Sequence, residues 1–282
     1  MNIFKGILFL LIGSAAVAFS GCNIINPVER TPSFLHIDSF QFTGNDEMGS
    51  SSRAITNVRV IYNNENLGVF DLPATIPVLA DKPGKLWFSP GVTYSGINNY
   101  QVTYPFYTTD TFSFTPSPTQ TQHITPKTGY YDPTTFDKII ADFERKEVPF
   151  LTVTGDTSLV LDSTDVFEGN YSGRITLANK LAVEFVLTEP FTAKTETYVE
   201  MNYKCSIPFV IGVQTSGASG TYIPVYASGL RPSANWNKVY VGLQQILIQY
   251  PGRPCRLLIM AAPETDKGGY LLLDNIKILS RK

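Results

Sequence analysis

The feature that most constrains this chain is a period-two alternation of apolar residues in short runs, which Gly, Pro and Asn interrupt. From 181 to 187 and from 199 to 205, every odd-numbered residue is apolar or aromatic, or is a cysteine. Side chains alternate between the two faces of a β-strand, so such a run packs one face against a core. The chain also holds 15 Tyr and 18 Phe among 21 Gly and 19 Pro, which suits strands joined by tight turns. The pattern predicts an all-β fold.

The order of these runs predicts two β units in tandem. The first begins near Phe34 and includes a hairpin, in which runs 58–62 and 67–72 flank the Asn-rich loop 63–66. Segment 115–133 is rich in Thr and Pro, and proline restricts the residue before it to extended conformations. We place the boundary inside this segment, which gives a unit at 34–127 and a second unit at 128–282. The second unit has the strand spacing of a two-sheet sandwich of roughly eight strands.

Both units resemble known β modules. Residues 57–91, with a Pro-flanked strand and a Pro-Gly turn, resemble small bacterial surface β-sandwich modules of the PEGA type. That resemblance implies an interaction or spacer module. DFE at 142–144, GNYSGRITL at 169–177, NWNKVYVGL at 235–243 and GYLLLDNIKIL at 269–279 resemble the jelly-roll of carbohydrate-binding modules and galactose-binding-like domains. The expected fold is therefore a small N-terminal β-sandwich followed by a C-terminal jelly-roll β-sandwich.

The N-terminus reads MNIFKGILFLLIGSAAVAFSGC. Its apolar run is shorter than the about 20 residues that span a membrane, and it has the length of a secretory signal. FSGC at 19–22 resembles a bacterial lipobox, which implies a signal peptide at 1–21, a lipid on Cys22 and a tether at 22–33. Asn23 is not the Asp that resembles inner-membrane retention, so we predict a lipid anchor in the outer membrane, on a side left open. The alternative is an ordinary signal peptide followed by a chance cysteine.

Composition and motifs argue against nucleic-acid binding and catalysis. The formal net charge is −2, and no long Lys/Arg run occurs. The chain's two histidines, His36 and His123, lie in separate segments, and no His-Glu-x-x-His, Cys-x-x-Cys or Gly-x-Ser-x-Gly is present. A glycosidase would need two facing carboxylates. The acids available are Asp162, Asp165, Glu168 and Glu184, and turn positions account for the first three. We predict that the chain is not an enzyme.

Cys205 and Cys255 are the cysteines that remain if Cys22 is lipidated. An oxidising periplasm would permit one disulfide between them. Free cysteine also behaves as a small buried apolar residue, so the sequence leaves the disulfide open.

Two functions fit a membrane-anchored, non-catalytic pair of β modules. The first is an interaction or scaffold subunit of an outer-membrane assembly, with outer-membrane proteins as partners. The alternative is a glycan-binding surface lipoprotein that uses the concave face of the jelly-roll. Aromatic rings can stack on a sugar while polar neighbours bond its hydroxyls. The candidate contacts, in the polar phase of two strands, are Tyr198, Glu200, Asn202, Tyr240 and Gln244. That phase could equally be the solvated side of the sheet.

The last strand places one charge in the wrong phase. If it is regular, the even-numbered residues from 270 to 278 face inward, because the other set includes Asn275 and Lys277. Asp274 is then a buried carboxylate, which is costly unless it is neutralised, hydrogen-bonded or bound to a metal. A β-bulge could turn it outward, or a neighbouring turn could donate hydrogen bonds. The resemblance to carbohydrate-binding modules implies a third solution, a structural Ca²⁺ held by Glu144 and Asp274 with backbone carbonyls.

Overall fold

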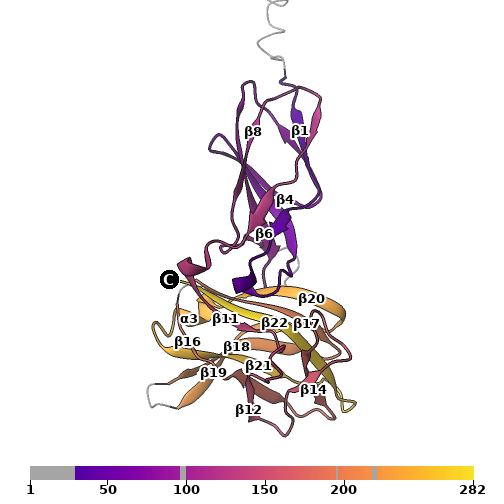
Figure 1. The fold of residues 1–282 in the computed structure, drawn as a ribbon, viewed down its shortest axis with the longest axis vertical. Helices are drawn as coiled ribbons and strands as arrows, with labels where there is room; N and C mark the ends of the chain where they lie inside the picture. The colour runs from indigo at the N-terminus through magenta and orange to yellow at the C-terminus, as the bar shows by residue number, and fades with distance from the viewer. Residues whose placement is uncertain (1–28, 96–99, 195, 218–220) are drawn as a thin grey trace, which may run out of the picture.

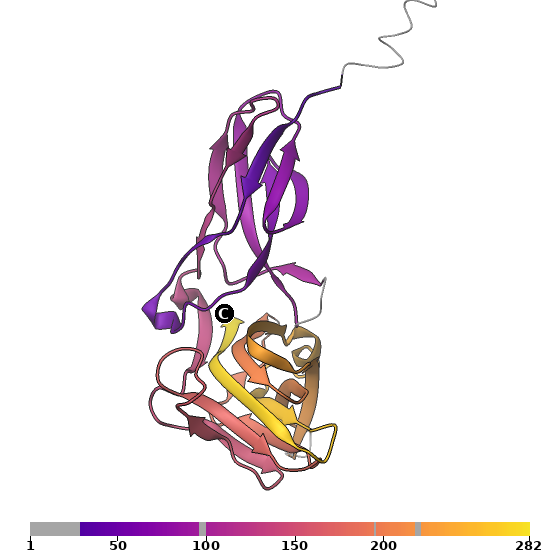
Figure 2. The ribbon, with the colours of Figure 1, turned by 90° about the vertical axis from the view of Figure 1, so that its right-hand side faces the viewer.

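A computed structural model describes residues 29–95, 100–194, 196–217 and 221–282. It shows two β units stacked along the long axis of the molecule (Figures 1 and 2). The predicted signal peptide and Cys22 lie outside the described residues. Within the described ranges, no helix combines the length and apolar character needed to cross a membrane.

The N-terminal unit is a small β-sandwich, as predicted. Its elements are β1 (Ser33–Ile37), β2 (Gln41–Thr43), η1 (Asp46–Met48), β3 (Ile55–Tyr62), β4 (Glu65–Asp71), β5 (Ala74–Val78), β6 (Gly84–Thr93), β7 (Gln101–Thr103), β8 (Asp110–Phe114), β9 (Thr121–His123) and β10 (Lys127–Gly129). A three-stranded sheet in the order β5-β1-β9 packs on a five-stranded sheet in the order β4-β3-β6-β7, in which β8 also pairs with β6. Alternate apolar residues fill the core between them, among them Leu35, Ile37, Val58, Val60, Ile76, Leu86, Phe88 and Phe114.

The Asn-rich hairpin is tighter than the sequence predicted. Tyr62 pairs with Glu65, which leaves a two-residue turn. Asn63 and Asn64 have φ values of 44° and 72°. Positive φ at both central positions matches the right-handed strand twist, and Asn tolerates it better than most residues.

The C-terminal unit is a jelly-roll β-sandwich, which confirms the predicted fold class. Its elements are η2 (Pro133–Thr135), β11 (Phe136–Ala141), β12 (Phe150–Thr154), β13 (Val160–Asp162), β14 (Ser172–Leu177), β15 (Val183–Leu187), β16 (Phe191–Thr192), β17 (Thr197–Cys205), β18 (Phe209–Ser216), β19 (Tyr222–Leu230), β20 (Ser233–Gly242), α3 (Gln244–Leu247), β21 (Pro254–Ala261) and β22 (Gly269–Arg281).

Its strands form two sheets that we name by their surroundings. The joint sheet has the order β13-β14-β22-β17-β20, with β11 also paired to β22. The open sheet has the order β12-β15-β21-β18-β19, with β16 also paired to β21. The odd-numbered residues of β15 and of β17 from 199 onward lie in the core between the sheets, as the alternation predicted. Leu181, predicted to share that face, precedes β15 and is exposed.

The N-terminal unit stands on the outer side of the joint sheet, and the open sheet lies at the far end of the molecule (Figures 1 and 2). The chain passes from one unit to the other after β10, which pairs with β2, and before β11, which pairs with β22. The boundary that we predicted between residues 127 and 128 stays a prediction. Cys205 and Cys255 are both free and buried, and burial raises the pKa of each thiol.

Candidate functional site

The glycan contacts predicted on β17 are buried. Tyr198, Glu200 and Asn202 have exposed fractions of 6%, 0% and 1%. Strand β17 pairs with β20 and β22 in the joint sheet, and the N-terminal unit covers the outer side of that sheet (Figure 1). The expectation that these side chains face solvent is therefore wrong. They offer no accessible surface to a glycan in this arrangement.

The two contacts predicted on the next strand do not form a binding face either. Tyr240 is 1% exposed, and its hydroxyl accepts the backbone N–H of Ala54 at 2.9 Å and meets the Tyr107 hydroxyl at 3.0 Å. Strand β20 ends at Gly242, and Gln244 is the first residue of the short helix α3. The predicted strand through Gln244 is thus wrong, because the chain turns into a helix there.

Glu200 is the centre of a buried polar network between the units. Its carboxylate accepts hydrogen bonds from the hydroxyls of Tyr104 at 2.7 Å and Tyr130 at 2.8 Å, and it pairs with Lys238 at 3.2 Å. Burial alone would raise the pKa of Glu200, but Lys238, Lys277 and the tyrosine hydroxyls together hold it below its ordinary value. The acid is therefore ionised and serves to connect the two units.

Lys277 completes this network from β22. Its ammonium donates to the carbonyl oxygen of Ser50 at 2.6 Å and to the hydroxyl of Tyr130 at 3.0 Å. Burial lowers the pKa of Lys277 to about 8, against the opposing effect of Glu200. Around the network packs an aromatic and apolar cluster of Met48, Val92, Tyr94, Tyr104, Phe106, Tyr107, Phe136, Tyr198, Tyr240 and Leu279. We call this network and cluster the joint, and its role is structural.

A β-bulge in β22 resolves the position of Asp274. Glu200 pairs with Lys277 and Asn202 with Asp274, so β22 has one residue more than β17 in this interval. Asn275 has a φ of 49°, which Asn adopts more readily than most residues. The residues that reach the core are Leu271, Leu273, Ile276 and Ile278. The predicted inward face is therefore wrong before the bulge and correct after it.

Asp274 nevertheless remains buried. Its carboxylate accepts backbone N–H groups from Phe167 and Glu168, each at 3.2 Å, and from Asn275 at 2.7 Å. Two of the three predicted solutions, the bulge and hydrogen bonds from a neighbouring turn, are thus present together. Burial raises the pKa of Asp274 to about 7, and the charge of nearby Glu144 adds to the increase.

Glu144 was the second predicted calcium ligand. Its carboxylate accepts the backbone N–H groups of Asn170 at 2.7 Å and Tyr171 at 2.9 Å. Desolvation alone would raise the pKa of Glu144, but these bonds and the Asn170 side chain lower it. Two interacting carboxylates fit a divalent cation in charge, although backbone N–H groups already bond their oxygens. Calcium therefore stays a prediction.

The other acids weighed from the sequence lie in different places. Asp162 pairs with Arg174 at 2.9 Å, and Asp165 pairs with Lys204 at 2.7 Å. Asp162 is mostly buried rather than solvated, and hydrogen bonds lower its pKa to about 2 in spite of its desolvation. Glu184 lies on β15 in the open sheet. The ion pairs of Asp162 and Asp165 bind turns and strands together.

The outer side of the open sheet faces away from the N-terminal unit (Figures 1 and 2). Strand register places one row of side chains across its five successive strands, namely Leu151, Val186, Leu258, Gly212 and Tyr226. The residues on either side of this row in β15, β21 and β18 belong to the core. The row therefore lies on the outer face of the open sheet, where Leu151 and Tyr226 are exposed and Val186, Gly212 and Leu258 are buried. We call this outer face, with its neighbouring rows, the open face.

Tyr226 lies across the open face. It is 45% exposed, and its hydroxyl donates to Glu184 on β15, so the ring extends over β18 and β21. That hydrogen bond is the main cause that raises the pKa of Tyr226 to about 12, with burial second. Gly212 pairs with Tyr226 on the neighbouring strand. A glycine is needed at this position because a Cβ there would approach the carbonyl oxygen of Val225 to 2.3 Å. The result is an aromatic platform whose orientation is fixed by the sheet.

Polar groups surround this platform. Glu184 also accepts a hydrogen bond from the Thr154 hydroxyl at 3.3 Å. Gln214 pairs with Arg256 in the adjacent row, and both are half-buried. Tyr222, 59% exposed, lies on the same side of β19 as Tyr226. An aromatic platform with carboxylate, amide and guanidinium neighbours can stack on the C–H face of a sugar and bond its hydroxyls.

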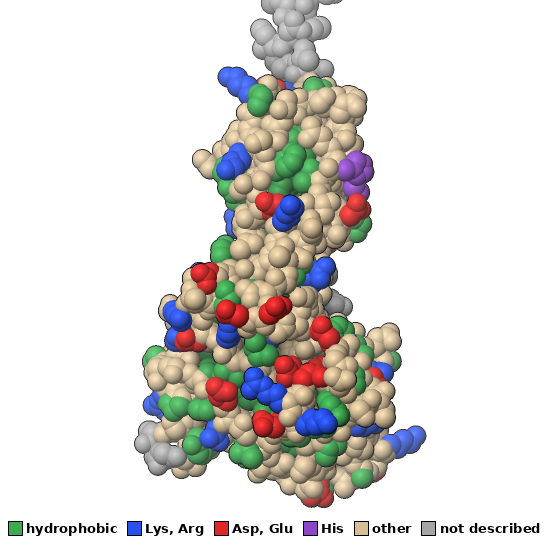
Figure 3. Space-filling view, viewed as in Figure 1, with side chains coloured by type: hydrophobic (Ala, Val, Ile, Leu, Met, Phe, Trp, Pro, Cys, Tyr) green, Lys and Arg blue, Asp and Glu red, His purple; other side chains and the backbone are tan. Residues whose placement is uncertain are grey.

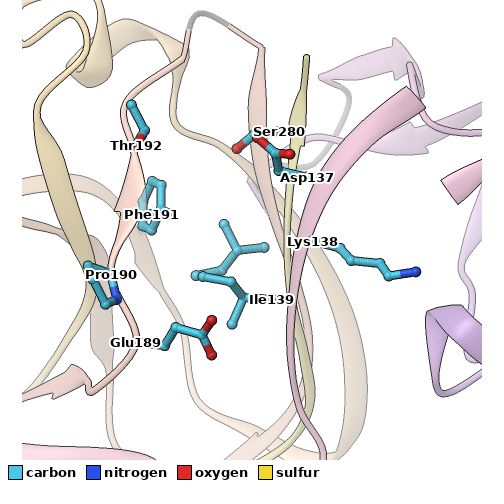
Figure 4. Close-up of a pocket in the computed structure, with 9 residues that line it drawn as sticks. Asp137, Lys138, Ile139, Glu189, Pro190, Phe191, Thr192 and Ser280 are labelled. Carbon is cyan, nitrogen blue, oxygen red and sulfur yellow. The ribbon is translucent and has the colours of Figure 1, made fainter. Parts of the chain in front are cut away.

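The described residues line several cavities, two of which have volumes of about 370 and 400 Å³. One of about 250 Å³ opens between β11 and β16, and its lining residues are Asp137, Lys138, Ile139, Glu189, Pro190, Phe191, Thr192, Ile278 and Ser280 (Figure 4). Lys138 points away from it and pairs with Glu47 at 3.0 Å, while Asp137 pairs with Lys194. Asp137 and Lys138 are thus engaged elsewhere, and the volume of this cavity is below the roughly 300 Å³ typical of ligand sites.

Sequence reasoning missed the open face. Strand β18 has the sequence FVIGVQTS, in which Gly212 is an isolated glycine. An isolated glycine in a strand pattern signals a bulge or a close backbone approach, and Gly212 has both. Two tyrosines four residues apart in one strand also share a face, which was the second available signal.

Comparisons with known proteins give the following likenesses. The sequence matches no known family and no curated protein. Among solved structures, the xylan-binding CBM22-1 domain of Paenibacillus barcinonensis Xyn10C is 17% identical, with 52% of this chain and 97% of that chain covered and a TM-score of 0.41. A family 30 carbohydrate-binding module is 16% identical, with coverage of 47% and 91% and a TM-score of 0.39. TmCBM61, solved with β-1,4-galactotriose, is 14% identical, with coverage of 50% and 94% and a TM-score of 0.34.

Proposed function

We propose that this chain binds a polysaccharide on the open face and has no catalytic activity. The observation that supports this is Tyr226, a half-exposed ring fixed across the sheet by its bond to Glu184. A ring held in place loses little freedom on binding, so stacking on a sugar costs little conformational entropy. Gln214 and Arg256 in the adjacent row supply donors for sugar hydroxyls.

Retardation of the full chain in polysaccharide-containing gels tests this proposal. We expect Tyr226→Ala to weaken binding about tenfold or more, because the stacking platform is lost. Tyr226→Phe keeps the ring but loses the bond to Glu184, so its binding should be intermediate. Tyr131→Ala, which alters an exposed tyrosine far from the open face in sequence, is the matched control and should bind normally. Failure of the unmodified chain to bind any glycan on a broad array would overturn the proposal.

A second candidate is binding to a protein partner as an interaction subunit of an outer-membrane assembly. It is favoured by the exposed apolar side chains of Leu151 and Val153 on the edge strand β12. Edge strands with exposed apolar residues pair readily with another chain. If the glycan array is negative, Val153→Lys should then abolish capture of a membrane-protein partner by the full chain.

We also propose that Cys22 carries a lipid that holds the chain in the outer membrane. The lipobox-like FSGC and the polar segment after it support this. The first described residues lie at the end of the N-terminal unit opposite the open sheet (Figures 1 and 2). An anchor there would leave the open face unobstructed.

A further inference from the structure

Both histidines of the chain meet on the surface of the N-terminal unit. His36 lies on β1, the central strand of the sheet β5-β1-β9. Strand β9 runs parallel to β1 and places His123 directly beside His36. No local motif announced this, because the two residues come from segments far apart in the sequence.

A carboxylate lies beside the two imidazole rings. Asp38 follows β1 directly, and its Oδ1 lies 3.1 Å from Nε2 of His36. The ring centroids of His36 and His123 are 4.8 Å apart. One ligand atom from each of the three side chains lies within 4.8 Å of the others. In a tetrahedral zinc site with bonds of about 2.0–2.2 Å, ligand atoms are about 3.3–3.6 Å apart. The ligand atoms of His36 and Asp38 are already near that separation, and the side chain of His123 is exposed and would move closer to them on binding.

A fourth residue orients His36. Thr75 lies opposite His36 on β5, and its hydroxyl is 2.8 Å from Nδ1 of the imidazole. When Nδ1 carries the proton and donates to Thr75, the Nε2 lone pair points at the Asp38 carboxylate. A cation between Nε2 and Oδ1 satisfies both atoms. Metal-bound histidines usually have such a partner on the second ring nitrogen.

The site is open to solvent. The side chain of His36 is 25% exposed and that of Asp38 is 77% exposed. Figure 3 shows the histidine side chains at the surface of the upper unit, with an acidic side chain directly below them. Two ligands come from paired strands and the third from the residue just after one of them, so the sheet limits how far the ligands can separate.

We propose that His36, Asp38 and His123 bind a divalent transition metal of the zinc, copper and nickel group. Two imidazoles and one carboxylate are a ligand set that these ions prefer over magnesium or calcium. Three protein ligands leave one position of a tetrahedral site for water or for a group from another molecule. The site is independent of the open face, so it adds a metal-dependent contact point at the opposite unit.

Isothermal titration with zinc chloride tests the proposal. The full chain carries a Cys22→Ala background, which removes a thiol that could compete for zinc. We expect one zinc ion per chain, and a fall in affinity of at least about tenfold in His123→Gln and in Asp38→Asn. Thr75→Val should weaken binding by about tenfold while leaving the ligands in place. Copper titration followed by electron paramagnetic resonance should show coupling to two nitrogens in the parent protein and to one in His123→Gln.

The matched control is Glu65→Gln, which removes an exposed acid of the same unit and should bind zinc normally. His123 is exposed, so its substitution leaves the fold intact. Absence of saturable zinc binding by the parent chain would overturn the proposal. Equal affinity in the parent chain and His123→Gln would do the same.

Discussion

Protonation of Asp274 should affect the stability of the folded chain. Its pKa is about 7 in the folded chain against an ordinary 3.8, because it is buried. Between these values the folded form holds more protons than the unfolded form, so the free energy of unfolding falls as pH rises. The loss reaches up to about 4 kcal/mol above pH 7, at about 1.4 kcal/mol for each pKa unit. Urea unfolding of the full chain from pH 4 to pH 8 should show this slope, and Asp274→Asn should remove it.

If Glu144 and Asp274 bind calcium, the ion should also change how the free energy of unfolding depends on pH. A bound cation keeps both carboxylates ionised and adds stability that grows with its concentration. Thermal unfolding at pH 8 would then occur at a higher temperature in millimolar Ca²⁺ than in EDTA, in the parent chain but not in Asp274→Asn. Equal midpoints in both solutions would exclude the metal. Parallel pH profiles of the parent chain and the variant would exclude the raised pKa.

At the scale of the element, strand phase could be predicted only where strands are regular. The odd-numbered residues of β17 from 199 to 205 lie in the core as predicted, because nothing interrupts their alternation. In β22 the extra residue at Asn275 reverses the phase, and Leu271 and Leu273 face the core instead of Leu272. A bulge is decided by pairing with neighbouring strands, which a single run of residues does not encode.

The sequence could not show that the predicted glycan contacts on β17 are buried, because the N-terminal unit covers that face of the joint sheet. Polar alternation in β17 correctly placed Glu200 and Asn202 opposite the core, and solvent was assumed to fill that side. Instead, tyrosines near residues 104–107 and 130 cover it and bond its acid. The open face depends on the register of β18, β19 and β21, which aligns Gly212 with Tyr226.

At the scale of the whole molecule, the joint should be sensitive to the charge of Glu200. Glu200→Gln removes the counter-charge of Lys238 and Lys277, which stay buried. A buried pair that loses one partner typically costs about 3–5 kcal/mol, so urea unfolding should show a loss of that size. The same charge gives the parent chain stability at neutral pH that is lost in acid, as pH falls through the lowered pKa of Glu200.

A second substitution in the joint tests whether the loss of stability comes from the uncompensated charge. Adding Lys277→Met to Glu200→Gln removes one uncompensated ammonium and should recover part of the lost stability. Glu65→Gln, on the exposed side of the same N-terminal unit, should change stability little. A cost below about 1 kcal/mol for Glu200→Gln, the range of exposed pairs, would show that the network does not couple the units.

The lipid anchor predicts where the whole molecule is found. Cys22→Ala, placed behind a conventional cleavable signal peptide, should move the protein from the membrane to the soluble fraction. Each acyl CH₂ group buried in the bilayer contributes about 0.8 kcal/mol, so the acylated form should stay membrane-bound. Mass spectrometry of the N-terminal peptide should show the acyl chains on Cys22. A variant that remains on membranes in high salt would contradict the prediction.

The stacking of the two units also sets the distance between the open face and the end of the molecule where the chain enters. Because the joint fixes the C-terminal sandwich on the far end of the N-terminal unit, the open face points away from the place where the chain enters (Figures 1 and 2). In a protein held by Cys22, the open face would then lie about one molecule's length from the bilayer. It would not touch the lipid headgroups. Polymers that lie on the membrane would be out of its reach. Polymers that cross the neighbouring space at that height would meet it, so the length of the stack would act as a filter on what the protein can hold.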